Sequence, residues 1–341
     1  MILFECDYQE GCAPEILSRL QATNMEQTIG YSGDGYCEQA RQLILRKIDA
    51  PQAHVHFLVG GTQTNTAVIQ YLLRPHQGVL CANTGHINVH ESGAIEHNGH
   101  KVLALPSDNG LITATQVRDA MEAHLHDPNY EHMVQPGMVY LSLPSELGTL
   151  YSRQDLHDIY AVCRHYHIPL FIDGARLGYG LASPHCDLQW HDLPRLCDIF
   201  YIGGTKQGAL FGEALVICNP DYQKDFRYFI KQGGGLLAKG RLLGIQFLTR
   251  FTDDLYMRLA HHAIDEALRI RQALLDKGYT LYRDSPTNQQ FAIFEDSKLQ
   301  ALQREFMFSF WEKTDATHIA VRICTSWATR TEDVNRLIEA L

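Results

Sequence analysis

Short apolar runs and helical patterns alternate through the first two thirds of the chain. Seven runs are rich in β-branched and aromatic residues, and several are almost entirely apolar, as strands covered on both faces should be. The predicted strands cover residues 55–59, 78–82, 101–106, 138–143, 169–173, 198–203 and 214–218. Helical patterns lie between many of them, for example at 64–73 and 155–166. This alternation predicts an α/β fold with a doubly wound, mostly parallel, seven-stranded sheet.

The pattern changes towards the carboxyl end. A long amphipathic helical stretch at 241–278 follows a cluster of three glycines, and strand-like runs come next at 290–294, 306–311 and 318–325. A last helical pattern covers 331–341. We expect a smaller C-terminal α+β domain joined through a connecting helix. The predicted division is an N-terminal segment 1–30, a large α/β domain 31–240 and a small domain 241–341.

Charge and composition exclude several classes of partner. The net charge is -10 and the pI is about 6.0, with 45% hydrophobic residues. A surface of this sign does not attract nucleic acids or anionic membranes, which are themselves negatively charged. No apolar run approaches the roughly 18 residues that span a bilayer. We therefore expect a small-molecule partner, with no nucleic acid and no membrane.

The cysteines and the N-terminus indicate a compartment. Nine cysteines are scattered without a C-x-x-C pair, which is typical of reduced thiols packed as small hydrophobic side chains. The N-terminus is acidic and lacks the basic start and long apolar run of a signal peptide. These features predict a cytoplasmic protein.

In an open α/β sheet, ligands bind beyond the carboxyl ends of the parallel strands, so the residues that follow each predicted strand are candidates for chemistry. Gly60-Gly61-Thr62-Gln63 follows the first strand and leads into a predicted helix. The free N–H groups and the dipole of a helix start, with a threonine hydroxyl, suit one phosphate. A plain strand-to-helix turn is the alternative, because the segment has neither the P-loop nor the dinucleotide-binding glycine pattern.

An imidazole, His86, follows the second predicted strand. It is placed either to stack on an aromatic cofactor or to bind a metal ion together with His90 and Glu91. The metal hypothesis is the weaker one, because the spacing matches neither H-E-x-x-H nor its inverse. We predict no metal site.

An acidic residue, Asp173, ends the fifth predicted strand, and Arg176 follows three positions later. A carboxylate at the end of an apolar run is costly to bury unless it meets a cation or a strong donor. A protonated ring nitrogen of a cofactor would meet that need. The alternative is an ion pair between Asp173 and Arg176.

One lysine, Lys206, stands between glycine-rich turns after the sixth predicted strand. A lysine beside apolar backbone is desolvated, so that its amine loses a proton more readily and becomes a nucleophile. Taken alone, the segment also fits an ordinary turn lysine. A phosphate cradle, a stacking histidine, a buried carboxylate and this amine together match the needs of pyridoxal 5'-phosphate. The sequence therefore predicts that cofactor.

Longer motifs surround these residues over nearly the whole chain. They run from Asp7-Tyr8 and Gly30-Tyr31-Ser32-Gly33-Asp34 to Thr325-Ser326-Trp327, and include Asp173-Gly174-Ala175-Arg176-Leu177, Ile202-Gly203-Gly204-Thr205-Lys206, Gly212-Glu213-Ala214 and the glycine-rich run 231–240. Together they resemble the threonine aldolase and β-eliminating lyase family of pyridoxal-phosphate enzymes. The resemblance implies the aspartate aminotransferase-like fold, type I of the PLP-dependent transferases.

The resemblance also implies roles for the matching residues. Lys206 is similar to the lysine that forms a Schiff base with the cofactor, Asp173 to the partner of the pyridine nitrogen and His86 to the histidine that stacks on the ring. The remaining cofactor contacts fall on the phosphate loop, on the residue beside the lysine and on the arginine of the aspartate motif: Gly61, Thr62, Gln63, Thr205 and Arg176.

The substrate side of the site follows from the same resemblance. Arg176 and Arg322 are similar to two arginines that hold the substrate carboxylate, a task that suits a permanently charged, two-pronged donor. The family's histidine after the fourth strand is missing, and Glu146 stands in that stretch as the candidate base, with His86 and His90 as the alternatives. The N-terminal element of the family is also changed, to Glu5-Cys6-Asp7-Tyr8.

We therefore expect an L-threonine aldolase-like lyase that cleaves the Cα–Cβ bond of a β-hydroxy-α-amino acid, such as threonine or allo-threonine, to glycine and an aldehyde. The alternatives are β-elimination or transamination with the same cofactor, and a non-catalytic scaffold that keeps the shape only. The resemblance further implies a homodimer or homotetramer with sites at the subunit boundary. Tyr31, Lys231 and Lys239 are candidates for residues that reach a neighbouring site.

Overall fold

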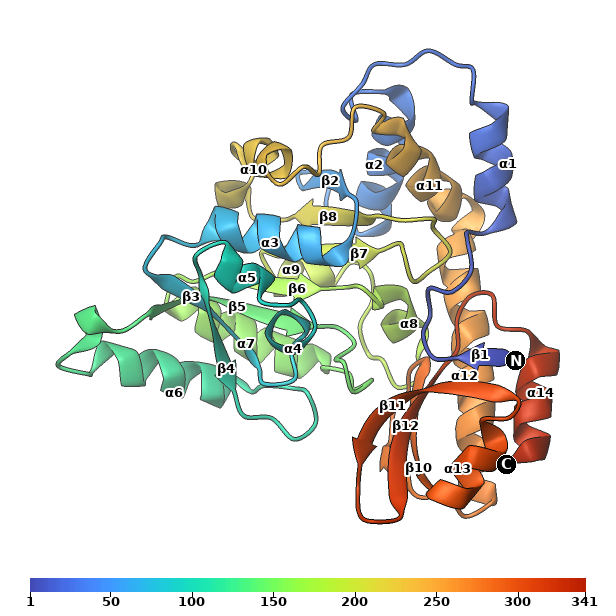
Figure 1. Ribbon diagram of the computed structural model, residues 1–341. Helices are drawn as coiled ribbons and strands as arrows, with labels where there is room; N and C mark the ends of the chain where they lie inside the picture. Colours follow the sequence, from blue (N-terminus) through green and yellow to red (C-terminus); the bar gives the residue numbers. More distant parts are fainter.

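The computed structural model describes all 341 residues and contains a seven-stranded central sheet (Figure 1). The strand order is β2-β8-β7-β6-β5-β3-β4. The strands span His54–Leu58 (β2), Gln77–Ala82 (β3), Lys101–Leu105 (β4), Gln135–Ser142 (β5), Leu170–Asp173 (β6), Ile199–Gly203 (β7) and Glu213–Ile217 (β8). All seven predicted strands are present, with ends that differ by a few residues.

The sheet is parallel except at one strand. β3, β4, β5, β6 and β7 pair in parallel, whereas β8 is antiparallel to both β7 and β2. The connection from β7 to β8 is short, and only an antiparallel pair can be joined without a crossover of a dozen or more residues. The predicted mostly parallel α/β sheet is confirmed.

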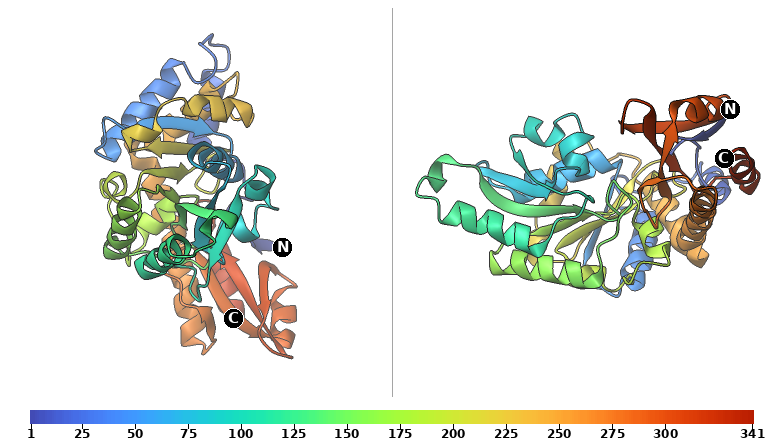
Figure 2. Two further views of the ribbon diagram at one scale, coloured as in Figure 1. Left: turned by 90° about the vertical axis from the view of Figure 1, so that its left-hand side faces the viewer. Right: turned by 90° about the horizontal axis from the view of Figure 1, so that it is seen from below.

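Helices cover both faces of this sheet, as Figure 2 shows in its right-hand view. Successive side chains of a strand point to opposite faces. On β7, Phe200 and Ile202 join one hydrophobic cluster, while Ile199 and Tyr201 join the other. The first cluster includes residues of Gly35–Lys47 (α2), Ala114–Leu125 (α6), Arg153–His165 (α7), Leu177–Ala182 (α8), Leu193–Leu196 (α9) and Arg241–Phe251 (α11). The second includes residues of Gly61–Leu72 (α3), His86–Val89 (α4), Ala94–His97 (α5) and Phe226–Gln232 (α10).

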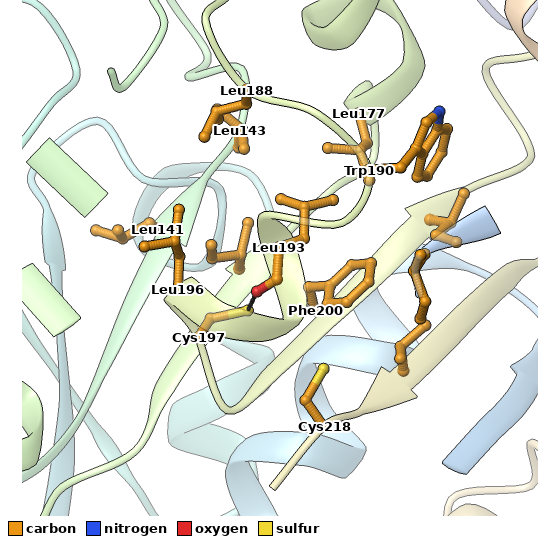
Figure 3. Packing of buried hydrophobic residues seen from close by; sticks show 14 of the residues in the cluster. Leu141, Leu143, Leu177, Leu188, Trp190, Leu193, Leu196, Cys197, Phe200 and Cys218 are labelled. Atoms are coloured by element: carbon orange, nitrogen blue, oxygen red, sulfur yellow. Dashed lines mark hydrogen bonds between the residues drawn. The ribbon is translucent and has the colours of Figure 1, made fainter. Parts of the chain in front are cut away.

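Figure 3 shows the first cluster around Cys197 and Phe200. The thiol of Cys197 donates to the carbonyl oxygen of Leu193 at 3.2 Å. All nine cysteines are free, and most are buried. The buried thiols are therefore part of the core and form no disulfide. No helix combines the length and apolar character that a membrane span requires.

The small domain is built around a five-stranded sheet with the order β1-β11-β12-β10-β9. Its strands are Ile2–Phe4 (β1), Leu281–Arg283 (β9), Gln289–Glu295 (β10), Phe306–Lys313 (β11) and His318–Cys324 (β12), and its helices include Asp296–Leu302 (α13) and Thr331–Ala340 (α14). β1 comes from the N-terminus and pairs in parallel with β11. The sequence pattern predicted β10, β11 and β12 but neither β1 nor β9, because three residues are too few for a recognisable alternation.

The predicted helical stretch 241–278 is two helices, α11 and Leu255–Asp276 (α12). α11 ends where its C-cap Thr252 becomes extended, with ψ of 135°. Asp253 and Asp254 follow with φ of 50° and 55°, in the left-handed region, so one continuous helix is not possible. α11 packs against α2 in the large domain. α12 runs from the first cluster to the core of the small domain, where Ile270 and Leu274 lie (Figure 1). The division of the chain at residue 241 stays a prediction.

The N-terminal part otherwise lies on the large domain. Pro14–Ala22 (α1) packs against α11. The segment between β1 and α1 carries Asp7 and Tyr8 past the carboxyl ends of the central strands, and Tyr8 lines the cavity described next. The N-terminal segment therefore forms a strand of the small domain first and then runs along the cavity to the large domain.

Candidate active site

A cavity of about 340 Å³ lies where the carboxyl ends of β5, β6 and β7 meet the start of α3. This cavity is lined by most of the site residues that the sequence analysis proposed: Gly61, Thr62, His86, Glu146, Asp173, Arg176, Thr205 and Lys206. Gln63 and Arg322 are not part of its lining. Strand ends that are far apart in the sequence thus meet at one edge of the sheet.

Asp173, the last residue of β6, is buried and fully hydrogen bonded. Its Oδ1 accepts from the Tyr201 hydroxyl at 2.5 Å and from the Ala175 N–H at 3.0 Å. Its Oδ2 accepts from the Tyr140 hydroxyl at 2.5 Å and from Nδ2 of Asn65 at 3.1 Å. Four donors therefore converge on this carboxylate.

These donors keep Asp173 ionised. Burial by itself raises the pKa of Asp173, but the charge of His86 and the two tyrosine hydroxyls outweigh burial and lower the pKa below its usual value. The ion pair between Asp173 and Arg176, the alternative that the spacing left open, is absent. Asp173 is therefore a carboxylate that lines the cavity without an ion pair to Arg176.

Arg176 is bound by Asp7 instead. Its Nε lies 2.7 Å from Oδ2 and its Nη2 lies 3.0 Å from Oδ1 of Asp7, a two-pronged pairing. Nδ2 of Asn288 donates to the same carboxylate at 2.9 Å. Burial raises the pKa of Asp7, but Arg176 and Lys206 outweigh it and lower the pKa. The orientation of Arg176 in the cavity is therefore fixed by the N-terminal segment.

His86 is held by a buried carboxylate, Glu91. Nδ1 of His86 lies 2.7 Å from Oε1 of Glu91, whose side chain is completely buried. Nδ2 of Asn65 donates to that same Oε1 at 2.8 Å and also to Asp173. A continuous set of hydrogen bonds thus links the imidazole to the carboxylate at the end of β6.

Glu146 lies in the loop after β5. Its Oε1 accepts from the Ser142 hydroxyl at 2.5 Å and from the backbone N–H of His86 at 2.9 Å. Its Oε2 is buried and has no partner. Burial raises the pKa of Glu146 above its usual value. A carboxyl group with one free oxygen and a raised pKa has the properties of a general base.

Lys206 follows β7 in a turn and is partly buried. Its backbone carbonyl accepts from the Tyr179 hydroxyl at 2.6 Å, whereas its amine makes neither a hydrogen bond nor an ion pair. Burial, together with the positive charge of Arg176, lowers the pKa of the amine. The amine of Lys206 therefore has no partner in the chain and a lowered pKa, and its role as the cofactor-binding amine stays a prediction.

The start of α3 provides an open helix N-terminus. Its N-cap, Gly60, makes no side-chain cap, and the first N–H groups of a helix have no partner within it. The Gln63 side chain is used inside the chain: Oε1 accepts from the Val59 N–H at 3.1 Å, and Nε2 donates to the Gly233 carbonyl at 2.9 Å. The Gln63 side chain thus ties the loop to the glycine cluster.

Arg322 lines a second cavity of about 430 Å³, and Glu146 lines both cavities. Nη2 of Arg322 donates to Oγ of Ser309 at 3.2 Å, while its Nε is buried without a partner. Its guanidinium carbon lies 5.9 Å from the ring centroid of Trp311. His90 lines this second cavity, with its ring 5.5 Å from that of His86. The two predicted arginines therefore stand in neighbouring spaces joined at Glu146.

Three further predicted residues lie away from both cavities. Nζ of Lys231 lies 4.6 Å from the ring centroid of Tyr31, and these two residues and Lys239 are exposed on the chain. Their contribution to a neighbouring site stays a prediction. No group of three or more histidine, cysteine, aspartate or glutamate side chains is arranged to hold a metal ion.

The first cavity fits pyridoxal phosphate. The start of α3 suits a phosphate, and a Cβ atom added to Gly60 would meet no atom within 4 Å. Asp173 offers an anion to a ring nitrogen, and Lys206 offers an amine to an aldehyde. The residues required are present, and the space between them is open.

Comparison with known proteins agrees with this geometry. Residues 8–297 match the model of a family described as β-eliminating lyase. The chain belongs to the β-eliminating lyase family. Over 340 residues it is 29% identical to a low specificity L-threonine aldolase of Pseudomonas aeruginosa, with 98% of this chain and 95% of the relative covered. The solved structure of a Leishmania major threonine aldolase superposes with a TM-score of 0.96 at 41% identity, covering 99% of this chain and 98% of that one.

This β-eliminating lyase family member has the type I fold of pyridoxal-phosphate enzymes, and pyridoxal phosphate is its cofactor. A histidinol-phosphate aminotransferase from Clostridium acetobutylicum shares the fold, with a TM-score of 0.74 at 12% identity. The predicted family and fold class are confirmed. The predicted role of each residue in the site stays a prediction.

The sequence analysis did not assign these roles to several residues of the site: Asp7, Asn65, Glu91, Tyr140, Tyr201 and Glu213. Glu91 was considered only as a metal ligand, although its position five residues after His86 was the available signal. Tyr140 and Tyr201 fall inside predicted strands, where an aromatic residue looks like core. Their hydroxyls become informative only when both are seen to reach Asp173.

Proposed function

We propose that this protein is a threonine aldolase-like lyase that cleaves the Cα–Cβ bond of a β-hydroxy-α-amino acid to glycine and an aldehyde. The observation that carries the proposal is the free Oε2 of Glu146. Oε2 is buried without a partner, and Glu146 lines both the cavity that fits the cofactor and the one that holds Arg322. The likeness to threonine aldolases over 98% of the chain supports the same conclusion.

The residues of the first cavity would bind the cofactor and keep its ring nitrogen protonated. Lys206 would hold the cofactor through its amine, the start of α3 its phosphate and Asp173 its ring nitrogen. When bound, pyridoxal phosphate supplies an electron sink that stabilises negative charge at Cα of an amino acid. Tyr140 and Tyr201 keep Asp173 anionic, which is the state that a protonated ring nitrogen needs.

The arginines orient the substrate. Arg176 and Arg322 bring two permanent positive charges to the junction of the cavities, and a substrate carboxylate between them is held by charge-assisted hydrogen bonds. Asp7 takes up Nε and Nη2 of Arg176, so Nη1 of Arg176 is the group left for a substrate carboxylate. The donors of Arg322 are also largely used, because Nη1 donates to Oε1 of Gln289 and Nη2 donates to the Glu5 carbonyl and to Oγ of Ser309.

Glu146 takes the β-hydroxyl proton on Oε2. The electron pair of that O–H bond then forms the carbonyl bond of the aldehyde, and the pair of the Cα–Cβ bond stays at Cα, which takes up a proton to give glycine. Proton transfer by a positioned group contributes about 10²–10⁴-fold to such reactions. His86 and His90 are the other bases near this point, since His86 lines the first cavity and His90 the second.

The second cavity is the space for the substituent on Cβ. Val89, Phe310 and Trp311 give it an apolar wall, and its volume of about 430 Å³ leaves room for groups much larger than a methyl. Such a wall favours β-hydroxy-amino acids with apolar side chains over polar ones.

A substrate panel tests the proposal. Purified protein with added pyridoxal phosphate is incubated with L-threonine, L-allo-threonine and phenylserine, and glycine and aldehyde are quantified. Release of both in equal amounts is expected. Pyruvate and ammonia without aldehyde would instead identify a β-eliminating enzyme, and amino-group transfer to a keto acid would identify an aminotransferase.

A spectroscopic control separates an enzyme from a scaffold. The Lys206→Ala variant is expected to lose the visible absorbance that the wild-type protein shows with pyridoxal phosphate. An unchanged spectrum in that variant would support a non-catalytic protein.

We further propose that the chain forms a homodimer or a pair of dimers with sites at the boundary. Large apolar side chains are exposed near Tyr31, among them Met25, Ile29 and Tyr228. Exposed apolar groups of this size are typical of a surface that a partner covers. Light scattering after size exclusion measures the mass and tests this point.

A further inference from the structure

Glu213 is a buried carboxylate beside the turn that carries Lys206, and the reaction proposed above gives it no role. It is the first residue of β8, is 3% exposed and lines the cofactor cavity. Its Oε2 accepts from the Gly204 N–H at 2.8 Å, and its Oε1 accepts from the Thr205 hydroxyl at 3.0 Å. Gly204 and Thr205 directly precede Lys206. The carboxylate thus holds the backbone from which the lysine side chain extends.

The Thr205 hydroxyl also binds the residue at the far end of the turn, Gly212. It accepts a hydrogen bond from the Gly212 N–H at 3.0 Å while it donates to Glu213. Gly212 has a φ of 105°, a conformation that favours glycine. Gly203 and Glu213 are also paired residues of the β7–β8 ladder. Both ends of the turn that presents Lys206 are therefore connected through Thr205 and Glu213.

A buried cation, Arg250, lies behind the same turn. Its Nη1 is 3.4 Å from the carbonyl oxygens of Gly203, Gly204 and Gln207. Arg250 is completely buried, and its Nε and Nη2 have no partner. It forms no ion pair, and Glu213 is the carboxylate whose charge acts on it. A buried cation in this setting needs a nearby negative charge.

Glu213 therefore faces two cations, Lys206 and Arg250. The phenols of Tyr201 and Tyr256 also lie near it, and burial raises the pKa of both, so they stay neutral. Asp173 and Arg176 line the same cavity. Burial raises the pKa of Glu213 to about 7 against the opposing effect of its hydrogen bonds and of Lys206. The Glu213 side chain thus changes its charge near neutral pH.

Three carboxylates and one arginine act on the amine of Lys206. Arg176 lowers the pKa of the amine, and Asp7, Asp173 and Glu213 raise it. Asp7 is already paired with Arg176, and Asp173 is bound by two tyrosine hydroxyls. Glu213 is the carboxylate among them whose hydrogen bonds go to the Lys206 turn itself.

We propose that Glu213 is a positioning residue for Lys206: it fixes the turn that presents the amine and supplies the negative charge that sets how readily the amine loses its proton. The inference rests on the proposed use of Lys206 as the cofactor-binding amine. Its test does not depend on aldolase activity, so a failure of the proposed reaction and a failure of this inference are distinguishable.

The test measures the amine directly. Cofactor-free wild-type protein and Glu213→Gln are labelled with trinitrobenzenesulfonate over a range of pH, and the labelling rate of Lys206 is read by peptide mass spectrometry. Removing the negative charge disfavours the ammonium form, so the midpoint for Lys206 is expected to move down by about one pH unit. The midpoint of the exposed Lys101 on β4 in the same samples is expected to stay unchanged.

A matched control replaces another buried carboxylate. Glu266 is 5% exposed but pairs with Arg269 on α12 and does not line the cavity. Glu266→Gln is expected to leave the Lys206 midpoint at the wild-type value. A folded Glu213→Gln protein with the wild-type midpoint would overturn the inference.

A reciprocal variant tests the pair if Glu213→Gln does not fold. In Lys206→Met the cation is lost, so Glu213 is expected to stay protonated to higher pH and to add a protonated-carboxyl band in the infrared spectrum at neutral pH. Electrostatic coupling of two groups is mutual, so this effect must accompany the first. Identical carboxyl titrations in Lys206→Met and wild type would also overturn the inference.

Discussion

The imidazole of His86 and the carboxylate of Glu91 are joined at 2.7 Å, and the Glu91 side chain is completely buried. The bond commits Nδ1 of the ring, so the tautomer and the ring plane of His86 are set by a residue that does not line the cavity. Asn65 extends the same connection to Asp173. The two cofactor-facing residues are therefore held by one network.

Replacement of Glu91 tests this network. Glu91→Gln keeps the size but removes the charge that the imidazole meets, and hydrogen bonds to charged groups are worth about 1.5–3 kcal/mol. We expect kcat/KM to fall about 10–100-fold and its pH dependence to change. The exposed Glu96 on α5 gives the control, Glu96→Gln, which is expected to match wild type in steady-state kinetics. A pH profile of Glu91→Gln that coincides with wild type would contradict the role assigned to Glu91.

The pairing of Asp7 with Arg176 predicts a stability effect. Asp7→Asn leaves a buried guanidinium without its counter-ion, which costs about 3–5 kcal/mol in comparable buried pairs. Denaturant unfolding measures the loss. Asp284→Asn removes the partner of Arg271 at a more exposed site, where a change of about 1 kcal/mol or less is expected. Equal losses in the two variants would show that Asp7 does not act as the counter-ion of a buried cation.

Acid titration of stability tests the same carboxylate. The folded-state pKa of Asp7 is lowered below 3.8, so its contribution is fully present above the pKa of the unfolded chain and is lost as pH falls through the folded pKa. Wild type is therefore expected to lose stability more steeply than Asp7→Asn below about pH 4. Parallel curves for the two proteins would contradict the lowered pKa.

If Glu146 is the general base, the activity is expected to fall at acidic pH. Its pKa is raised above 4.5 by burial, and a base works only when deprotonated, so the rate is expected to fall as pH drops through that raised pKa. Glu146→Gln is expected to lower kcat by about 10²–10⁴-fold. The exposed Glu312, bonded to Tyr282, supplies the control variant Glu312→Gln. Retained activity with an unchanged acid limb in Glu146→Gln would move the base to His86 or His90.

The wall of the second cavity predicts a change in substrate preference. Trp311→Ala removes apolar surface that a phenyl substituent would bury and a methyl would barely reach, worth about 1.5–3 kcal/mol. We expect kcat/KM for phenylserine to fall about tenfold or more, with a much smaller change for L-threonine. Binding of L-phenylalanine, which lacks the β-hydroxyl, gives a second measurement. Equal losses for both substrates would place the β-substituent elsewhere.

The strands and the central residues of the site were predictable from the sequence. Apolar runs of β-branched residues occur where a strand is buried on both faces, and the turn after each run is visible in the chain. Lys206, Asp173 and His86 each follow such a run, so a rule about strand ends was enough to bring them together. The residues that hydrogen bond to these three side chains do not lie at predictable positions along the chain. The spacing of Asp173 and Arg176 suggested an ion pair, whereas the structure pairs Arg176 with Asp7.

The sequence by itself determined the fold class, the family and the strand-end residues, because local periodicity and turn residues record what each segment does alone. Only the tertiary structure decided how those residues are held: β1 on the sheet of the small domain, Asp7 on Arg176, Glu91 on His86 and Glu213 on the Lys206 turn. These pairings depend on which charges and hydrogen-bond donors come into contact once the chain has folded. Contacts such as Asp7–Arg176 join segments far apart in the sequence, so no local pattern in the chain records them.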